Sequence, residues 1–181
     1  MKVYLFLAPG FETVEALAPV DTFKRAGVDI YTVSITNSLS VTSSHQVETK
    51  ANCLLKQIDI NDGDALILPG GFPGYKNLAQ TEAVGETARK YYESGRLLAA
   101  ICGAPTILQH YGIARGSRIT CHHTVKDQMT DFVYTGQDVE QDHNLITAIG
   151  AGHSFDFSLA LLYALQGEEK VTHVKSGLEL R

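Results

Sequence analysis

The sequence predicts an α/β fold in which a mostly parallel sheet is covered by helices on both faces. Short apolar strand segments alternate with amphipathic helical segments, at a spacing typical of strand–helix–strand units. Several strand segments are near-continuous apolar runs, as expected of strands that are buried on both sides. Turns rich in Pro and Gly follow three of these strands, at the edge where parallel sheets place their binding sites.

The predicted strands are short runs of apolar or β-branched residues that end at turn-forming residues. They cover residues 3–8, 28–35, 64–68, 97–101, 118–121 and 144–148. Residues 38–58 add short strand pieces within a polar stretch. The first run ends at Pro9-Gly10, and the run at 64–68 leads into residues 69–74, a loop dense in Pro and Gly.

The predicted helices connect these strands. They cover residues 12–25, 82–94, 104–111 and 155–166. Gly27 and Gly95 are placed to end the first two helices. Pro19 lies inside the first helix and predicts a kink or a break there. The last helix carries an apolar stripe of Phe155, Leu159, Leu162 and Tyr163.

Length, charge and cysteine content limit the class of protein. A chain of 181 residues suits one domain, residues 1–181. The net charge of −5 and the scattered basic residues argue against a nucleic-acid partner. Three cysteines, an odd number, favour a reducing, cytoplasmic location over a disulfide framework. The apolar start stops at Pro9-Gly10, and no later apolar run is long enough to span a bilayer, so no membrane partner is expected.

Cys102 has the sequence context of a nucleophile elbow. It ends the strand at 97–101, and small residues flank it at Ala100 and Ala104, where strand and helix crowd together. A cysteine at this apex lies beside the N-terminus of the next helix, whose free N–H groups and dipole favour thiolate over thiol. We therefore expect a nucleophile or redox centre at Cys102. The alternative is a buried structural cysteine.

Glycine turns at the neighbouring strand end predict an oxyanion hole. Backbone N–H groups at Gly70-Gly71, together with that of Gly103, can face a substrate oxygen if the sheet brings them beside Cys102. Taken alone, Gly70-Gly71 is better explained as a plain tight turn, because glycine turns of this kind are common. Neither G-x-G-x-x-G nor G-x-x-x-x-G-K-[ST] occurs, so a dinucleotide or P-loop site is unsupported.

Two glutamates are candidates for an acid beside the cysteine. Glu12 and Glu15 are three residues apart at the start of the first helix and share one face. A carboxyl buried in the cleft would have a raised pKa, stay protonated and donate a hydrogen bond to a thiolate. The alternative is the favourable acidic group of a first helical turn, a role that suits Glu12 better than Glu15.

Histidines supply the candidate bases. His122 and His123 follow a predicted strand, and either can act as general base for the cysteine. A metal site at Cys121-His122-His123 is disfavoured, because consecutive strand residues face opposite sides and no spaced second pair is evident. His153 is either a turn residue or part of the cleft. A serine hydrolase is disfavoured because G-x-S-x-G is absent.

The order and spacing of several short motifs carry a family resemblance. The motifs lie at residues 9–15, 19–21, 25–27, 68–71, 100–106, 116–120, 126–127 and 150–157. Together they resemble the ThiJ/PfpI/YajL superfamily, and within it the branch of the Parkinson-disease protein deglycase. The match covers nearly the whole chain. It implies a flavodoxin-like three-layer sandwich that forms a homodimer.

The resemblance also implies roles for individual residues. Cys102 takes the place of the reactive cysteine, Glu15 that of the glutamic acid hydrogen-bonded to it, and His122 that of the nearby histidine. Gly71 and Gly103 take the places of the backbone oxyanion donors. The resemblance thus favours Glu15 over its neighbouring glutamate and His122 over its neighbouring histidine.

Some positions depart from the family pattern. Gly103 stands where the protease-like branches carry a histidine directly after the cysteine, so peptidase chemistry is disfavoured. His123 stands where close relatives often have proline. Cys121 precedes the candidate histidine and is a candidate resolving thiol.

The activity implied is that of a cofactor-independent glyoxalase or deglycase, with no metal. Its substrates would be small reactive carbonyls such as 2-oxoaldehydes, or glycated protein. The alternative function is a redox-sensing or chaperone-like stress-response protein that uses the oxidisable Cys102. A third interpretation is a vestigial cleft in a protein whose role is interaction.

Overall fold

A central sheet of seven strands organises the computed structural model, which describes residues 1–180. The strand order is β10-β11-β7-β6-β1-β2-β5. The bounds are β1 Lys2–Leu7, β2 Asp29–Ser34, β5 Cys53–Leu54, β6 Ala65–Leu68, β7 Leu97–Ile101, β10 Val139–Asp142 and β11 Leu145–Ala148. All neighbouring strands in this sheet run parallel except β10, which pairs antiparallel with β11.

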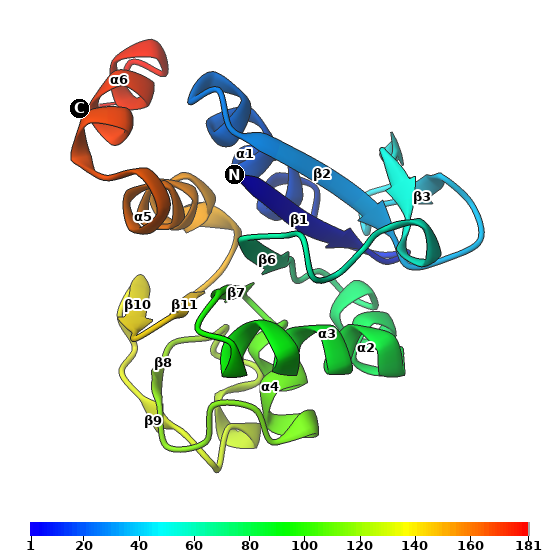
Figure 1. Ribbon diagram of the computed structural model, residues 1–181. Helices are drawn as coiled ribbons and strands as arrows, with labels where there is room; N and C mark the ends of the chain where they lie inside the picture. Colours follow the sequence, from blue (N-terminus) through cyan, green and yellow to red (C-terminus); the bar gives the residue numbers. More distant parts are fainter. Residues whose placement is uncertain (181) are drawn as a thin grey trace.

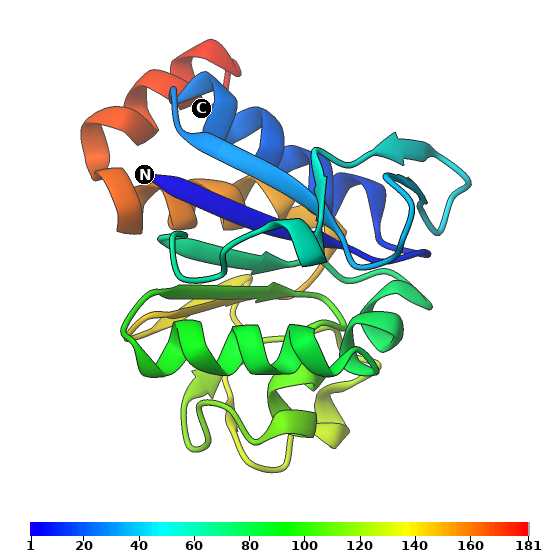
Figure 2. The same ribbon diagram turned by 45° about the vertical axis from the view of Figure 1, so that its right-hand side comes forward.

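Helices cover both faces of the sheet (Figures 1 and 2). One layer contains α1 Thr13–Arg25, α5 Ser154–Gln166 and α6 Glu168–Gly177. The other contains α2 Gly74–Ala79, α3 Glu82–Glu93 and α4 Pro105–Tyr111. The residues of β1 alternate between the two cores: Leu5 packs on the α1 side and Phe6 on the α2–α4 side. The predicted three-layer α/β sandwich is thereby confirmed.

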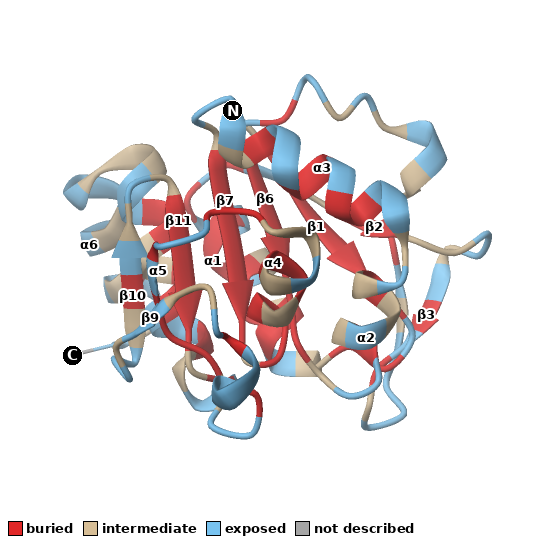
Figure 3. Ribbon diagram, turned by 90° about the horizontal axis from the view of Figure 1, so that it is seen from below, coloured by how far each residue is buried: buried red, intermediate tan, exposed pale blue. Residues whose placement is uncertain are grey.

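The central strands are buried along their length, as Figure 3 shows. Every residue of β6, β7 and β11 is buried, as is β1 apart from Lys2. A strand with helices on both faces needs apolar side chains at consecutive positions, which explains the near-continuous apolar runs. Among residues 1–180, no helix combines the length and apolarity needed to cross a bilayer.

Several local predictions need correction. Helix α1 continues through Pro19, so the predicted break is absent; the proline is buried in the packed face of the helix. The strand expected at 118–121 ends earlier, because β8, Arg118–Ile119, pairs with β9, Val133–Tyr134, in a separate ribbon. The strand pieces expected at 38–58 include a hairpin of β3, Ser40–Thr42, and β4, Glu48–Lys50, with β3 beyond the end of β2 in Figure 1. The turn of this hairpin bonds to the start of α1 through Thr13 and Ser43.

Candidate active site

Cys102 lies at a strained elbow between β7 and α4. Its φ is +64°, in the left-handed region that L side chains rarely adopt. The conformation is held from both sides: the Cys102 N–H donates to the Ala148 carbonyl at 2.9 Å, and the Cys102 carbonyl accepts from the His122 N–H at 2.8 Å. This geometry projects the thiol out of the turn, as the small flanking residues predicted.

The Gly70-Gly71 turn brings a glutamate against this elbow. The Gly70 N–H donates to Glu15 Oε2 at 2.8 Å. A Cβ on Gly70 would lie 2.7 Å from that oxygen and 2.8 Å from the Cβ of Cys102. Gly71 has a φ of +87°, and a Cβ there would lie 2.2 Å from the backbone nitrogen of Glu12. The turn therefore requires glycine because three segments converge on it.

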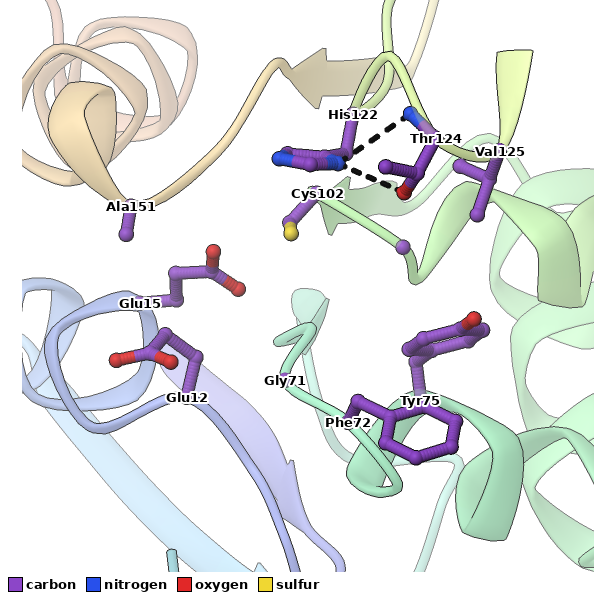
Figure 4. Close-up of a pocket in the computed structure, with 11 residues that line it drawn as sticks. Glu12, Glu15, Gly71, Phe72, Tyr75, Cys102, His122, Thr124, Val125 and Ala151 are labelled. Atoms are coloured by element: carbon purple, nitrogen blue, oxygen red, sulfur yellow. Dashed lines mark hydrogen bonds between the residues drawn. The ribbon is translucent and has the colours of Figure 1, made fainter. Parts of the chain in front are cut away.

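A cavity of about 420 Å³ opens at this junction (Figure 4). Its lining includes all five residues predicted for the site: Glu15, Gly71, Cys102, Gly103 and His122. It also includes residues that the sequence did not single out for the site, namely Phe72, Tyr75, Thr124, Val125 and Ala151. Glu12 lines the same cavity, so both glutamates reach the cleft and neither is merely a surface group of the first helical turn.

Glu15 is a buried carboxyl that faces the sulfur. The residue is fully buried, and its Oε1 has no hydrogen-bond partner. Burial raises the pKa of Glu15 to about 7. The Gly70 N–H and the thiol of Cys102 oppose that rise, and the charge of Glu12 adds to it. At neutral pH, Glu15 can therefore both accept and donate a proton.

The pKa of Cys102 departs from the expected direction. Burial is the main cause that raises this pKa to about 12, and the charge of Glu15 and its hydrogen bond also raise it. The N–H groups of Gly103 and Gly71 act in the opposite direction. The expectation of a thiolate at neutral pH, favoured by the helix N-terminus and by a protonated glutamate, is therefore wrong while Glu15 is ionised. Helix α4 has only seven residues, and its dipole does not outweigh burial beside a carboxylate.

Protonation of Glu15 changes this balance. A neutral Glu15 no longer repels the sulfur, and its O–H can donate to a thiolate. The thiolate is then opposed by burial alone and stabilised by two backbone N–H groups. Neither Gly71 nor Gly103 donates its N–H to a backbone carbonyl within residues 1–180. Cys102 and Glu15 therefore form a coupled pair, in which one group holds the proton while the other carries the negative charge.

His122 lies above the cysteine in the same cavity (Figure 4). Its Nδ1 is 2.8 Å from Thr124 Oγ1 and accepts from the Thr124 N–H at 3.4 Å. Burial lowers the pKa of His122, and the charge of His123 lowers it further. Both effects favour the uncharged imidazole, and the Thr124 N–H that donates to Nδ1 leaves the ring proton of that form on Nε2.

Cys121, His122 and His123 do not lie on a strand, so the opposite-facing geometry expected of them is wrong. These residues follow β8 in a loop, and the rings of His122 and His123 lie side by side with centroids 4.2 Å apart. In the part of the chain that the structure describes, no three His, Cys, Asp or Glu residues are grouped so as to share a metal ion.

Cys121 and His153 lie outside the cavity lining. Cys121 is buried in the core on the α4 side, whereas Cys102 packs against the α1 side. Burial also raises the pKa of Cys121 to about 11. As a fully buried thiol outside the lining, Cys121 does not face the cavity into which Cys102 opens. His153 Nδ1 lies 3.2 Å from Asp156 Oδ2, and its Nε2 lies 3.6 Å from Asp138 Oδ1. These contacts place the His153 side chain at the start of α5, between two carboxylates.

The fold and this cavity define an α/β sandwich protein with a cysteine at a nucleophile elbow and a buried acid beside it. The chain belongs to the DJ-1/PfpI family, whose sequence pattern matches residues 1–164. The chain is 34% identical to the Parkinson disease protein 7 homolog of Danio rerio over 184 residues, covering 99% of this chain and 97% of the relative.

Two further comparisons agree with this assignment. The chain is 34% identical to the glutathione-independent glyoxalase DJR-1.2 of Caenorhabditis elegans, covering 88% of this chain and 85% of the relative. The crystal structure of Drosophila melanogaster DJ-1beta superposes with a TM-score of 0.96 at 33% identity, covering 99% of this chain and 98% of that one. The family thus includes a protein named for glyoxalase activity.

Proposed function

We propose that this chain is a cysteine-dependent glyoxalase, with deglycase-like action on reactive carbonyls, and that small 2-oxoaldehydes such as methylglyoxal are its substrates. The observation that supports this most strongly is the Cys102–Glu15 pair. A nucleophile on a strained elbow faces a buried carboxyl whose pKa of about 7 suits proton transfer at neutral pH. The resemblance to a relative named as a glyoxalase supports the reaction class.

In the first step, Glu15 takes the thiol proton while the sulfur of Cys102 attacks the aldehyde carbon. A C–S bond forms, and the C=O π electrons move to oxygen. The N–H groups of Gly71 and Gly103, which already favour negative charge at the sulfur, are placed to stabilise the adjacent oxyanion. Protonation of that oxygen gives a hemithioacetal.

In the second step, a proton moves from the former aldehyde carbon to the neighbouring carbonyl carbon. Glu15 or His122 removes the C–H proton to give an enediolate and returns a proton to the other carbon, giving a thioester of a hydroxy acid. Water then cleaves the thioester, releasing lactate and the Cys102 thiol. The sum is methylglyoxal plus water giving lactic acid, with no external oxidant or reductant.

Lactate formation from methylglyoxal tests this function. Wild type should produce lactate, and Cys102→Ala should not, whereas Cys53→Ala should match wild type because Cys53 lies in β5, outside the cavity. Equal rates in wild type and Cys102→Ala would remove the cysteine from the mechanism.

A second candidate function is redox sensing through the same sulfur. The unpartnered Oε1 of the buried Glu15 supports it, because a protonated carboxyl there can donate to an oxygen added to Cys102. Under mild peroxide, mass spectrometry should find oxygen on Cys102 before Cys53 or Cys121. Earlier oxidation of either other cysteine would contradict the sensor.

We also propose a homodimer, as the family resemblance implies. The support in the structure is an apolar groove of about 390 Å³ between α1 and α5. Val14 and Phe155 line this groove and are 47% and 41% exposed, which is unusual for large apolar side chains at one site.

A further inference from the structure

Glu12 is a charged group in the cavity that the proposed reaction does not use. Its Oε2 accepts a hydrogen bond from Ser44 Oγ at 3.2 Å and lies 3.5 Å from His45 Nδ1. Ser44 and His45 belong to the turn between β3 and β4, so the hairpin holds this carboxylate at the cavity wall. The Glu12 side chain is only 18% exposed. The negative charge of Glu12 is therefore screened less by solvent and salt than the charge of a fully exposed carboxylate.

Two carboxyl groups and one imidazole line the cavity. Glu12 and Glu15 both line it, and within residues 1–180 no lysine or arginine does. The fully buried Glu15 keeps one oxygen without a hydrogen-bond partner. Figure 4 shows both residues at the start of α1, with the carboxyl of Glu15 pointing toward Cys102 and that of Glu12 at the outer part of the same wall. Burial and the neighbouring His123 lower the pKa of His122, which favours its uncharged form.

Aromatic rings form the opposite wall. Phe72 and Tyr75 lie across the cavity from Glu12 in Figure 4, with ring centroids 6.3 Å apart. The Phe72 ring already holds a cation outside the cavity lining, because the Lys76 ammonium lies 5.0 Å from its centroid. Lys76 is itself exposed and screened by solvent. Carboxylates facing aromatic rings are the surroundings that favour a cationic ligand.

We propose that Glu12 is a specificity-determining residue that selects for carbonyl compounds bearing a positive charge, such as an aldehyde on a chain with an ammonium group, and against anionic ones such as 2-oxo acids. This inference rests on the proposed function, because it names the substrate class of the same site. Glu12 acts through its charge on the substrate before the sulfur attacks, and takes no part in bond making.

Charged thiol reagents test this selection without relying on turnover. Methanethiosulfonates with a trimethylammonium or a sulfonate tail transfer the same kind of thioethyl group to a thiol and release methanesulfinate. Their rates of reaction at Cys102 are compared by peptide mapping at pH 9, where imidazoles are neutral and Glu15 is ionised. The ratio of the cationic to the anionic rate cancels the intrinsic reactivity of the sulfur.

The expected ratio exceeds one in wild type and falls about fivefold to tenfold in Glu12→Gln, because the lost charge acts with opposite sign on the two reagents. Phe72→Leu should lower the ratio by a smaller factor, about twofold, through loss of the ring face. Glu169→Gln, which removes an exposed charge on α6, should leave it unchanged. Cys53 is the internal control, since its ratio should not respond to Glu12→Gln.

Two results separate the proposals. A ratio at Cys102 that Glu12→Gln leaves unchanged would overturn the charge selection, whatever the rate of lactate formation. A ratio that falls as expected, in protein that forms no lactate from methylglyoxal, would support the charge selection and overturn the proposed reaction.

Discussion

Replacement of Glu15 by glutamine should make Cys102 a stronger acid and the protein a poorer catalyst. The glutamine side chain keeps the size of the original and an oxygen that can accept the Gly70 N–H, so the main change is loss of the charge. Two of the three causes that raise the pKa of Cys102 to about 12 come from Glu15.

The magnitude follows from Coulomb's law. Two unit charges about 4 Å apart interact by about 4 kcal/mol at an effective dielectric constant of about 20, an upper bound of about three pKa units. Burial is the largest of the causes and stays in the variant. We therefore expect the pKa of Cys102 to fall by about one to two units in Glu15→Gln.

The assay is the rate of Cys102 alkylation by iodoacetamide as a function of pH, mapped by mass spectrometry. The midpoint should move to lower pH in Glu15→Gln and stay in place in Glu169→Gln. Lactate formation should fall by about 10²-fold to 10⁴-fold despite the added thiolate, because the proton carrier is gone. A midpoint that stays or rises in Glu15→Gln would refute the electrostatic account of the pair.

Three further predictions concern stability and assembly. The pKa of Glu15 is about 7 in the folded protein against an ordinary value of 4.5, so its contribution to the free energy of unfolding is present below pH 4.5 and lost as pH rises through 7. Between pH 4 and pH 8, wild type should therefore lose about 3 kcal/mol of unfolding free energy relative to Glu15→Gln, measured by denaturant titration. Gly70→Ala should lower stability by about 1–3 kcal/mol and abolish lactate formation, since its Cβ would displace Glu15. The control is Gly177→Ala on α6, whose Cβ would meet only Arg25 Nη1 at 3.7 Å, an ordinary contact; it should match wild type in lactate formation. Val14→Glu should give a monomer by light scattering if the α1–α5 groove is the dimer contact; an unchanged mass would place the contact elsewhere.

Local sequence was sufficient to predict the elbow and its cysteine. The small residues around Cys102 and the apolar run before it are the steric requirements of the turn, so they are visible without the fold. Gly70 is different, because the close approach of Glu15 that requires glycine there is visible only once the chain is folded. Helix α6 was not predicted, because it is short, mostly polar and follows Gly167 directly.

The electrostatics of the site could not be predicted from sequence. The pKa of Cys102 depends on how deeply the thiol is buried and on the carboxylate of Glu15, which is brought to it from α1, far away in the chain. The residues next to Cys102 reveal only the dipole of the following helix. The aromatic wall was likewise missed, although Phe72 stands exposed in a loop of turn-forming residues, a signal that points to a binding site.

The central claim, that the sulfur of Cys102 forms the bond to substrate, is tested most directly by quenching the protein during turnover of methylglyoxal and mapping the covalent adduct. We predict a three-carbon adduct on Cys102 that forms within one turnover and disappears as lactate accumulates. Lactate formation with an unmodified Cys102 throughout, or with the adduct on Cys53, would contradict it.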